Sequence, residues 1–393
     1  MTSPAPHSRV MIVAGEASAD LHGAELVEAL HLQNPTLDIF GVGGETMRSK
    51  GFDALIPAES MSLAGLTEVL FALPRMFRYM KTLVEAARSR QPAVVVLIDL
   101  PDFNLRLAKR LKRLGIPVVY YISPQLWAWR QGRVEQIKRY VDRMLVILPF
   151  EKEFYDRHGV PVEFVGHPLV EELPERPDES AARQQLGLVE HSSPIVALLP
   201  GSRRKEVTRH LPIMLQSMKL LQGDFPGLTP VLPIASTIPR ELVESCVRES
   251  GLEVHVVEGQ STEVISAADA AVVCSGTSTL QTALLARPMV VVYRISWLSY
   301  QILQRLVRVA HIGLVNLIAG KRLVPELLQG EFTPTNVKNA LAEFLTDSPQ
   351  RAALQNELHT LRNQLGQGGT AARVALAVQS YLPAVPAPPT ETP

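Results

Sequence analysis

Short apolar runs alternate with amphipathic segments along most of this chain. In the first half, runs typical of strands lie at residues 10–15, 38–44, 93–99, 117–123, 143–149 and 162–166. In the second half, similar runs lie at residues 194–200, 230–235, 252–259, 270–276 and 289–294. Segments with helical spacing, such as 19–30 and 104–115, separate them. Uniformly apolar strands joined by helices predict parallel sheets that are covered on both faces.

The alternation breaks once, at residues 171–193, where prolines and charged residues surround one short helical stretch. We therefore predict an α/β protein with two doubly wound, Rossmann-like domains that face a cleft. Residues 1–170 and 194–345 are the two expected domains, and 171–193 is the expected linker. Residues 346–382 have a helical pattern and are expected to pack across the cleft, and the proline-rich residues 383–393 are expected to be a disordered tail.

The composition is that of an ordinary folded protein in a reducing compartment. Lys+Arg and Asp+Glu both number 39, so no overall positive charge favours nucleic acid as a partner. Cys246 and Cys274 are the only cysteines and have no metal-ligand spacing, which indicates a cytoplasmic protein with small buried thiols. The first apolar run leads into a glycine turn, which predicts a strand and not a signal peptide, and no window has the length of a membrane span.

The carboxyl end of the third apolar run carries an acidic pair. Asp99 ends the run Val94–Ile98, and Asp102 follows three residues later. Asp102 has the position of a helix N-cap, and a metal site is disfavoured because the spacing is not Asp-x-Asp and no His or Glu completes a ligand set. Asp99 has no such structural role. Because ligands of doubly wound sheets bind at the carboxyl ends of strands, a partly desolvated Asp99 is the candidate general base.

Two loops of the second half have the features of a phosphate site. The first follows strand 195–199 and contains Gly201, Ser202 and Arg203. The second follows strand 271–274 and contains Ser275, Gly276, Thr277, Thr279 and Gln281. Both place small or hydroxylated residues at a helix N-terminus, where free N–H groups attract anions. Either loop alone is also explained by a capped turn, whereas the two together favour a nucleotide diphosphate.

Two familiar nucleotide motifs are absent from the sequence. Neither phosphate loop is a Walker A motif, because no Gly-Lys-Ser/Thr follows at the required spacing. In "GVGGET", Thr46 stands where a dinucleotide-binding loop has its last glycine, which disfavours NAD.

Further candidates lie in the first half. After the first strand come Glu16, Ser18 and Asp20, of which Ser18 or Asp20 is expected to cap a helix and Glu16 to lie near the cleft. Trp127 follows another strand, and its indole can stack on a sugar or pack in the core.

One segment, 61–88, has the pattern of a basic amphipathic helix. Met76 and Met80 share one predicted face, and Arg75 and Arg78 share the other. This pattern fits acyl-chain docking at a membrane surface. An ordinary helix packed on the sheet is the alternative.

These pieces together resemble the lipid-A-disaccharide synthase family of inverting, two-domain glycosyltransferases of the GT-B type. The resemblance rests on "GEASADLHGAELVEAL", "IDLPDFNLRLAKRLK", "YYISPQLWAWRQGRV", "LLPGSRRKEV", "CSGTSTLQTALL" and "GLVNLIAGKRLVPELLQ". It implies that Asp99 is required, and that Asn316 joins the two phosphate loops in gripping UDP. The chain departs from the family pattern at Gln281, where a Glu is usual, at Ala19, where a Gly is usual, and at Val315, where a Pro is usual.

The resemblance also implies a reaction. The donor would be UDP-2,3-diacylglucosamine, the acceptor 2,3-diacylglucosamine 1-phosphate, and the products the β1→6 lipid A disaccharide 1-phosphate and UDP. Since the sequence has no carboxylate cluster, we expect a metal-independent reaction. We expect a cytoplasmic enzyme that attaches peripherally to the inner membrane, and a homodimer is left open. A UDP-sugar 2-epimerase on the same scaffold is the alternative function.

Overall fold

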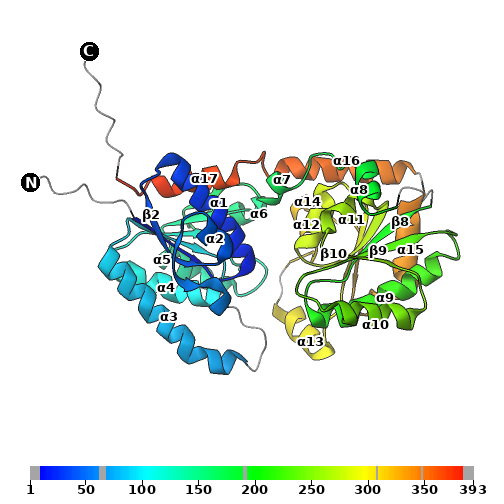
Figure 1. The fold of residues 1–393 in the computed structure, drawn as a ribbon, viewed down its shortest axis with the longest axis horizontal. Helices are drawn as coiled ribbons and strands as arrows, with labels where there is room; N and C mark the ends of the chain where they lie inside the picture. The colour runs from blue at the N-terminus through cyan, green and yellow to red at the C-terminus, as the bar shows by residue number, and fades with distance from the viewer. Residues whose placement is uncertain (1–8, 62–67, 189–192, 307–308, 347, 384–393) are drawn as a thin grey trace, which may run out of the picture. The chain divides into compact units, whose positions relative to one another are not determined.

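The computed structural model describes residues 9–61, 68–188, 193–306, 309–346 and 348–383. The chain divides into two compact units, one formed by Met1–Pro168 with Gly368–Pro393 and the other by Leu169–Gln367. Each unit contains one parallel sheet flanked by helices (Figure 1). The predicted α/β class with two doubly wound domains is confirmed.

The first unit has a sheet of seven parallel strands in the order β3-β2-β1-β4-β5-β6-β7. Its strands are β1 (Arg9–Ala14), β2 (Asp38–Gly43), β3 (Asp53–Pro57), β4 (Val94–Ile98), β5 (Val118–Tyr121), β6 (Arg143–Val146) and β7 (Val162–Phe164). Its helices are α1 (Ala17–Gln33), α2 (Glu45–Ser49), η1 (Ala58–Ser60), α3 (Glu68–Arg90), α4 (Pro101–Arg113), η2 (Gln131–Arg133), α5 (Val134–Tyr140), α6 (Pro149–Arg157) and α17 (Thr370–Gln379). The strand order reverses between the adjacent strands β1 and β4, so the carboxyl ends of these two strands form the switch point where such sheets bind ligands.

Helix α17, near the end of the chain, belongs to this first unit. It packs beside α1, as Figure 1 shows, and buries Val374 and Val378 against Leu26 and Val27. The apolar side chains on both faces of β1 and β4 are fully buried, which is why these strands read as continuous apolar runs.

The second unit has a sheet of six parallel strands in the order β10-β9-β8-β11-β12-β13. Its strands are β8 (Ile195–Leu199), β9 (Thr229–Ile234), β10 (His255–Glu258), β11 (Ala270–Cys274), β12 (Met289–Tyr293) and β13 (Glu326–Leu328). Its helices are α7 (Leu169–Glu172), α8 (Glu179–Gln185), α9 (Arg204–Leu221), α10 (Arg240–Ser250), α11 (Ser261–Ala267), α12 (Thr277–Leu284), α13 (Trp297–Leu306), α14 (Leu314–Ala319), η3 (Gln329–Glu331), α15 (Pro334–Leu345) and α16 (Pro349–Gln364). Strands β8 and β11 are neighbours, so the two predicted phosphate loops start side by side.

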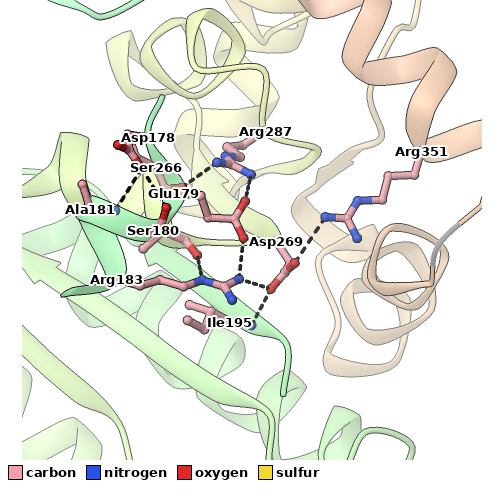
Figure 2. Close-up of polar contacts among 11 residues, drawn as sticks. Asp178, Glu179, Ser180, Ala181, Arg183, Ile195, Ser266, Asp269, Arg287 and Arg351 are labelled. Carbon is pink, nitrogen blue, oxygen red and sulfur yellow. Dashed lines mark hydrogen bonds and ion pairs between the residues drawn. The ribbon is translucent and has the colours of Figure 1, made fainter. Parts of the chain in front are cut away.

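The segment 171–193, which we expected to be a linker, contributes α7 and α8 to the second unit. Figure 2 shows the polar contacts that hold α8 there. Arg183 of α8 donates to Asp269 at 3.1 Å, and the same carboxylate accepts from Arg351 of α16 at 3.2 Å and from the Ile195 backbone at 2.9 Å. These long-range partners cannot be read from the local composition, which explains the difference from the expected linker.

Strands β3 and β13 were missing from the predicted set. Both lie at the edge of their sheet, and β13 has only three residues. Asp53 and Pro57 of β3 are exposed, so this strand lacks a continuous apolar run. No helix in the described part of the chain combines the length and apolarity needed to cross a membrane.

Candidate active site

Asp99 lies on a strained turn that joins β4 to α4. Asp99 and Leu100 both have left-handed backbones, with φ of 49° and 47°, a conformation that costs non-glycine residues free energy. Three donated hydrogen bonds hold the turn. The hydroxyl of Tyr120 donates to the Asp99 carbonyl at 2.5 Å, and the side-chain amide of Asn104 donates to the same carbonyl at 2.7 Å and to that of Ile98 at 3.2 Å.

The ends of β1 and β4 meet closely at this turn. Gly15, directly after β1, is buried, and a Cβ atom on it would lie 2.8 Å from the Leu100 side chain. A larger residue there would require the Leu100 side chain to move.

The electrostatic environment of Asp99 suits a base. Burial raises the pKa of its half-buried carboxyl above the usual value, while the Leu100 backbone N–H and the charge of His22 act in the opposite direction. A carboxylate with a raised pKa accepts a proton more readily, which suits a general base.

Sequence reasoning missed two buried or half-buried histidines, His22, whose charge acts on Asp99, and His167, on which His22 acts in turn. His22 of α1 contacts the ring of Tyr121 edge-on, with 6.4 Å between centroids, and its Nδ1 lies 3.6 Å from the Glu25 carboxylate. His167, which follows β7, is 7% exposed, and burial followed by the charge of His22 lowers its pKa to about 3. His167 is therefore neutral at physiological pH. No spacing in the sequence links these residues to Asp99, because His22 lies on α1, Asp99 follows β4 and His167 follows β7.

The structure corrects the expected role of Asp102. Because the left-handed residues Asp99 and Leu100 complete the turn early, α4 begins at Pro101 and its N-cap is Leu100. Asp102 lies inside the first turn of the helix and pairs with Arg133 at 2.5 Å.

Asp20 also differs from its expectation. Helix α1 starts at Ala17, ahead of Asp20, and the buried Asp20 carboxylate accepts instead from the backbone N–H groups of Gly44, Thr46 and Met47 at 2.6–3.2 Å. It therefore caps α2, the neighbouring helix, which a local reading cannot find.

The remaining candidates of the α1 loop, Glu16 and Ser18, are exposed. Glu16 is the N-cap position of α1 and makes no side-chain capping bond. Ser18 lies in the first turn, so neither it nor Asp20 caps α1.

Trp127 is a core residue, the alternative that the sequence left open. It is 8% exposed, stacks edge-on against Phe150 with 4.8 Å between centroids, and donates from its indole N–H to the buried carboxyl of Glu151 at 3.0 Å. Burial raises the pKa of Glu151 to about 8, against weaker opposing effects from its hydrogen bonds. Trp127 thus has little surface to offer a sugar.

The first phosphate loop is held by a carboxylate of its own helix. Gly201 has φ of 114°, and a Cβ atom there would meet Glu206 at 2.5 Å. Glu206 accepts from the backbone N–H groups of Ser202 and Arg203, both at 3.2 Å, and from the Arg203 guanidinium at 2.9 Å. The two N–H groups expected to be free are therefore occupied in this structure, while the Arg203 side chain is 81% exposed.

The second phosphate loop has its glycine and one threonine open to solvent. Gly276 is the N-cap of α12, and it and Thr277 are exposed. Ser275 donates to the Ile312 carbonyl at 3.2 Å, and the buried Thr279 donates to the Gly276 carbonyl at 2.7 Å. Thr279 therefore stabilises the loop from its buried side.

Gln281, one turn further along α12, is half-buried and faces the N-terminus of α11. Its side-chain amide donates to Ser261 at 3.3 Å and to Thr262 at 3.0 Å. A Glu at this position would be an acceptor in place of this donor.

A buried histidine connects the ends of β8 and β12. His210 is fully buried, and its Nε2 accepts from the Arg294 backbone N–H at 3.0 Å, so its Nδ1 is the protonated nitrogen and donates to the Pro200 carbonyl at 3.0 Å. Burial lowers its pKa, which favours the neutral ring. Sequence reasoning missed this residue because it lies inside helix α9.

Asn316 has a structural role in this structure. It is fully buried, its amide N–H group donates to Val324 and Glu326, and its oxygen accepts from the backbone N–H groups of Leu323 and Val324, all within 2.8–2.9 Å. The amide therefore already has protein partners on both sides, and a contact of Asn316 with the nucleotide stays a prediction.

The predicted amphipathic helix is α3, of which only part faces solvent. Met80 is 5% exposed and packs in the core, which corrects its expected place on a lipid-facing surface, and Met76 is half-buried. Arg75 and Arg78 are exposed beside Phe77, whose exposed fraction is 60%. Residues 62–67 of the predicted segment lie outside the described residues.

The sequence is similar to known proteins over nearly its whole length. The family described as Lipid-A-disaccharide synthetase matches residues 10–380. A lipid-A-disaccharide synthase of Myxococcus xanthus is 48% identical over 383 residues, which cover 98% of this chain and 99% of the relative.

Solved structures share the fold at much lower identity. A UDP-N-acetylglucosamine 2-epimerase from Listeria monocytogenes, described as putative, has a TM-score of 0.66 at 13% identity and covers 95% of this chain and 96% of its own. A calicheamicin glycosyltransferase has a TM-score of 0.58 at 14% identity, with 95% and 98% covered. At these identities the likeness concerns the fold alone, which transferases and epimerases share.

Proposed function

The chain belongs to the lipid-A-disaccharide synthase family, a family of glycosyltransferases in lipid A biosynthesis, and on this premise we propose how its residues carry out the reaction. Its substrates are a nucleotide sugar and a lipid-bearing sugar. We take the donor to be UDP-2,3-diacylglucosamine and the acceptor to be 2,3-diacylglucosamine 1-phosphate. The reaction joins them as the β1→6 disaccharide 1-phosphate and releases UDP.

The state of Asp99 supports its role as the base. The acceptor 6-hydroxyl gives its proton to the Asp99 carboxylate as its oxygen bonds to the anomeric carbon, and the bond from that carbon to UDP breaks on the opposite face. This in-line displacement inverts the anomeric centre, as in inverting glycosidases, where the base acts on water. General base catalysis of this kind contributes about 10²–10⁴ in rate.

The phosphate loops support donor binding in the second unit. Adjacent strands β8 and β11 bring Gly201 and Gly276 to the carboxyl edge of one sheet, where Gly276 is the N-cap of α12 and Gly201 lies two residues before the N-cap of α9. The exposed guanidinium of Arg203 can pair with the diphosphate and stabilise the charge on departing UDP.

The function is tested with the purified protein and both diacyl substrates, by mass spectrometry of the products. We expect the disaccharide phosphate and UDP from wild type, and a loss of about 10²-fold or more in turnover from Asp99→Asn, with UDP binding unchanged. Asp156→Asn, an exposed carboxylate of α6, is the matched control and should keep full turnover. Wild-type turnover in Asp99→Asn would exclude Asp99 as the base.

The epimerase alternative has a separate test. Incubation with the UDP-sugar alone should leave it unchanged, whereas an epimer formed without acceptor would identify the other activity. Membership of the synthase family at 48% identity favours the transferase.

We also propose that the reaction needs no metal ion, because the Arg203 guanidinium and the exposed N-terminus of α12 supply the positive charge that a divalent ion would otherwise provide. Turnover should persist in excess EDTA. Loss of turnover that magnesium restores would contradict this.

Peripheral membrane attachment is proposed through α3. Exposed Phe77 beside Arg75 and Arg78 combines an apolar anchor with cations that attract anionic lipids. Phe77→Ser should reduce binding to phosphatidylglycerol vesicles, while Leu32→Ser, an exposed leucine of α1, should not. Equal vesicle binding by Phe77→Ser and wild type would remove α3 as the attachment site.

A further inference from the structure

A pocket of about 410 Å³ lies between helices α4 and α5 of the first unit. Pro101, Asp102, Leu105, Arg106 and Lys109 line it from α4, and Arg133, Gln136, Arg139 and Tyr140 line it from the η2–α5 segment. On α4 these positions are spaced by three and four residues, so they form one helix face. The volume lies within the range of small-molecule sites.

The pocket is strongly positive. It contains the four cations Arg106, Lys109, Arg133 and Arg139 against one carboxylate, Asp102. The Arg133–Asp102 pair uses that carboxylate. In the part of the chain that the structure describes, none of the other three cations forms an ion pair, and Lys109 lies 6.0 Å above the ring of Tyr140. Three uncompensated charges around one concavity favour a multiply charged anion.

The chemistry of the lining favours a phosphate group over a lipid surface. Arginine has a planar fork of donors that matches two oxygens of a phosphate, and three of the four cations are arginines. The large aliphatic side chain of the lining, Leu105, is 5% exposed, so the pocket offers no apolar anchor of the kind that Phe77 gives α3. A concave site that lacks such an anchor suits a discrete ligand.

The geometry points to a phosphomonoester site between α4 and α5, and we propose that its ligand is the 1-phosphate of the acceptor sugar. This identification rests on the proposed function. Pro101 at the rim is two residues after Asp99, and because consecutive Cα atoms are about 3.8 Å apart, the two Cα atoms lie within about 7.6 Å. A hexose spans a comparable length, so the phosphate can bind at the pocket while the 6-hydroxyl faces the base.

The kinetic test removes charge but keeps the aliphatic stems. In Lys109→Gln/Arg139→Gln we expect the KM for the acceptor to rise about ten-fold or more, with kcat and the donor KM unchanged, because charge-assisted contacts to phosphate are lost. Arg113→Gln on α4 and Lys138→Gln on α5 are matched controls, exposed cations outside the pocket, and should leave all three constants unchanged. An unchanged acceptor KM in the double variant would overturn the proposal.

A binding test separates this proposal from the proposed function. Glucosamine 1-phosphate should bind wild type in calorimetry, bind the double variant about ten-fold more weakly, and compete with acceptor, whereas glucosamine should not bind. If wild type formed no disaccharide but this difference remained, the function would fail and the phosphate site would stand. Equal binding to both proteins would overturn the site.

Vesicles distinguish the sugar phosphate from a lipid headgroup. The double variant should bind phosphatidylglycerol vesicles as wild type does. If its vesicle binding fell about ten-fold while its acceptor KM stayed constant, the pocket would hold a lipid headgroup and the assignment to the acceptor would be wrong.

Discussion

The turn that carries Asp99 makes a quantitative prediction for Tyr120→Phe. Tyr120 is fully buried, and burial together with the nearby Asp99 charge holds its pKa well above the usual value, so its hydroxyl is a constant donor. The substitution removes only this hydroxyl, which donates to the Asp99 carbonyl at 2.5 Å. Asn104 remains to hold the turn.

The expected loss of stability follows from comparing the backbone strain at Asp99 and Leu100 with the hydrogen bonds that hold this turn. Two left-handed non-glycine residues cost about 1–3 kcal/mol each, so the turn stores about 2–6 kcal/mol. The three hydrogen bonds that hold it contribute about 1 kcal/mol each. Losing one of them should lower the free energy of unfolding by about 1 kcal/mol and allow Asp99 to shift. Because misplacing a reacting group by about 1 Å can cost 10²-fold, kcat should fall about ten-fold or more.

The assay combines urea unfolding with the rate of UDP release. Tyr155→Phe is the control, since it also loses a buried hydrogen bond, to Ser123 at 2.7 Å, but does not hold the turn. It should be similarly destabilised and keep its kcat. A wild-type kcat in Tyr120→Phe, or an equal loss in Tyr155→Phe, would refute the link between this hydroxyl and catalysis.

Three further results are expected. Because burial raises the pKa of Asp99 and the His22 charge opposes that rise, kcat/KM should fall as pH drops through this pKa, and His22→Gln should move the acid limb to higher pH; movement to lower pH would contradict this. Burial raises the pKa of Glu151 from 4.5 to about 8, so between these pH values the folded state keeps a proton that the unfolded chain loses. The free energy of unfolding should therefore fall by on the order of 5 kcal/mol as the pH rises from 4.5 to 8. In urea titrations, Glu151→Gln should remove most of this pH dependence. Asp269→Ala should lower the free energy of unfolding by about 3 kcal/mol, because two arginines and one backbone N–H group lose their acceptor. A loss below about 0.5 kcal/mol would show that the network of Figure 2 does not stabilise the fold.

The fold was predictable where the signal is local. Strands buried on both faces, such as β4 and β8, appear as apolar runs whose ends agree with the structure to within a residue or two. Strand β13 escaped because three residues at a sheet edge carry too little pattern. Asp99 became the candidate base because a carboxylate that directly follows a buried strand has no local structural explanation, and its role stays a prediction.

Side chains with distant partners were assigned less well. Asp20 caps a helix more than twenty residues away. Asn316 hydrogen-bonds the backbone that leads into β13, and Trp127 donates to Glu151 in the first turn of α6. Each of these residues has a polar group that suits a ligand equally well, and only the fold shows that protein groups already occupy it. His210 was missed for the converse reason, since a histidine inside an amphipathic helix gives no sign of the two loops that it joins.

In the first phosphate loop, the Glu206 carboxylate occupies the backbone N–H groups that an anionic ligand would use. An anion that accepts hydrogen bonds from the Ser202 and Arg203 backbones must displace this side chain, which can bind again when the anion dissociates. Entry and exit thus become an exchange of one negative group for another. For the proposed UDP site, such an exchange would lower the affinity for the released nucleotide and so favour repeated turnover over retention of the product.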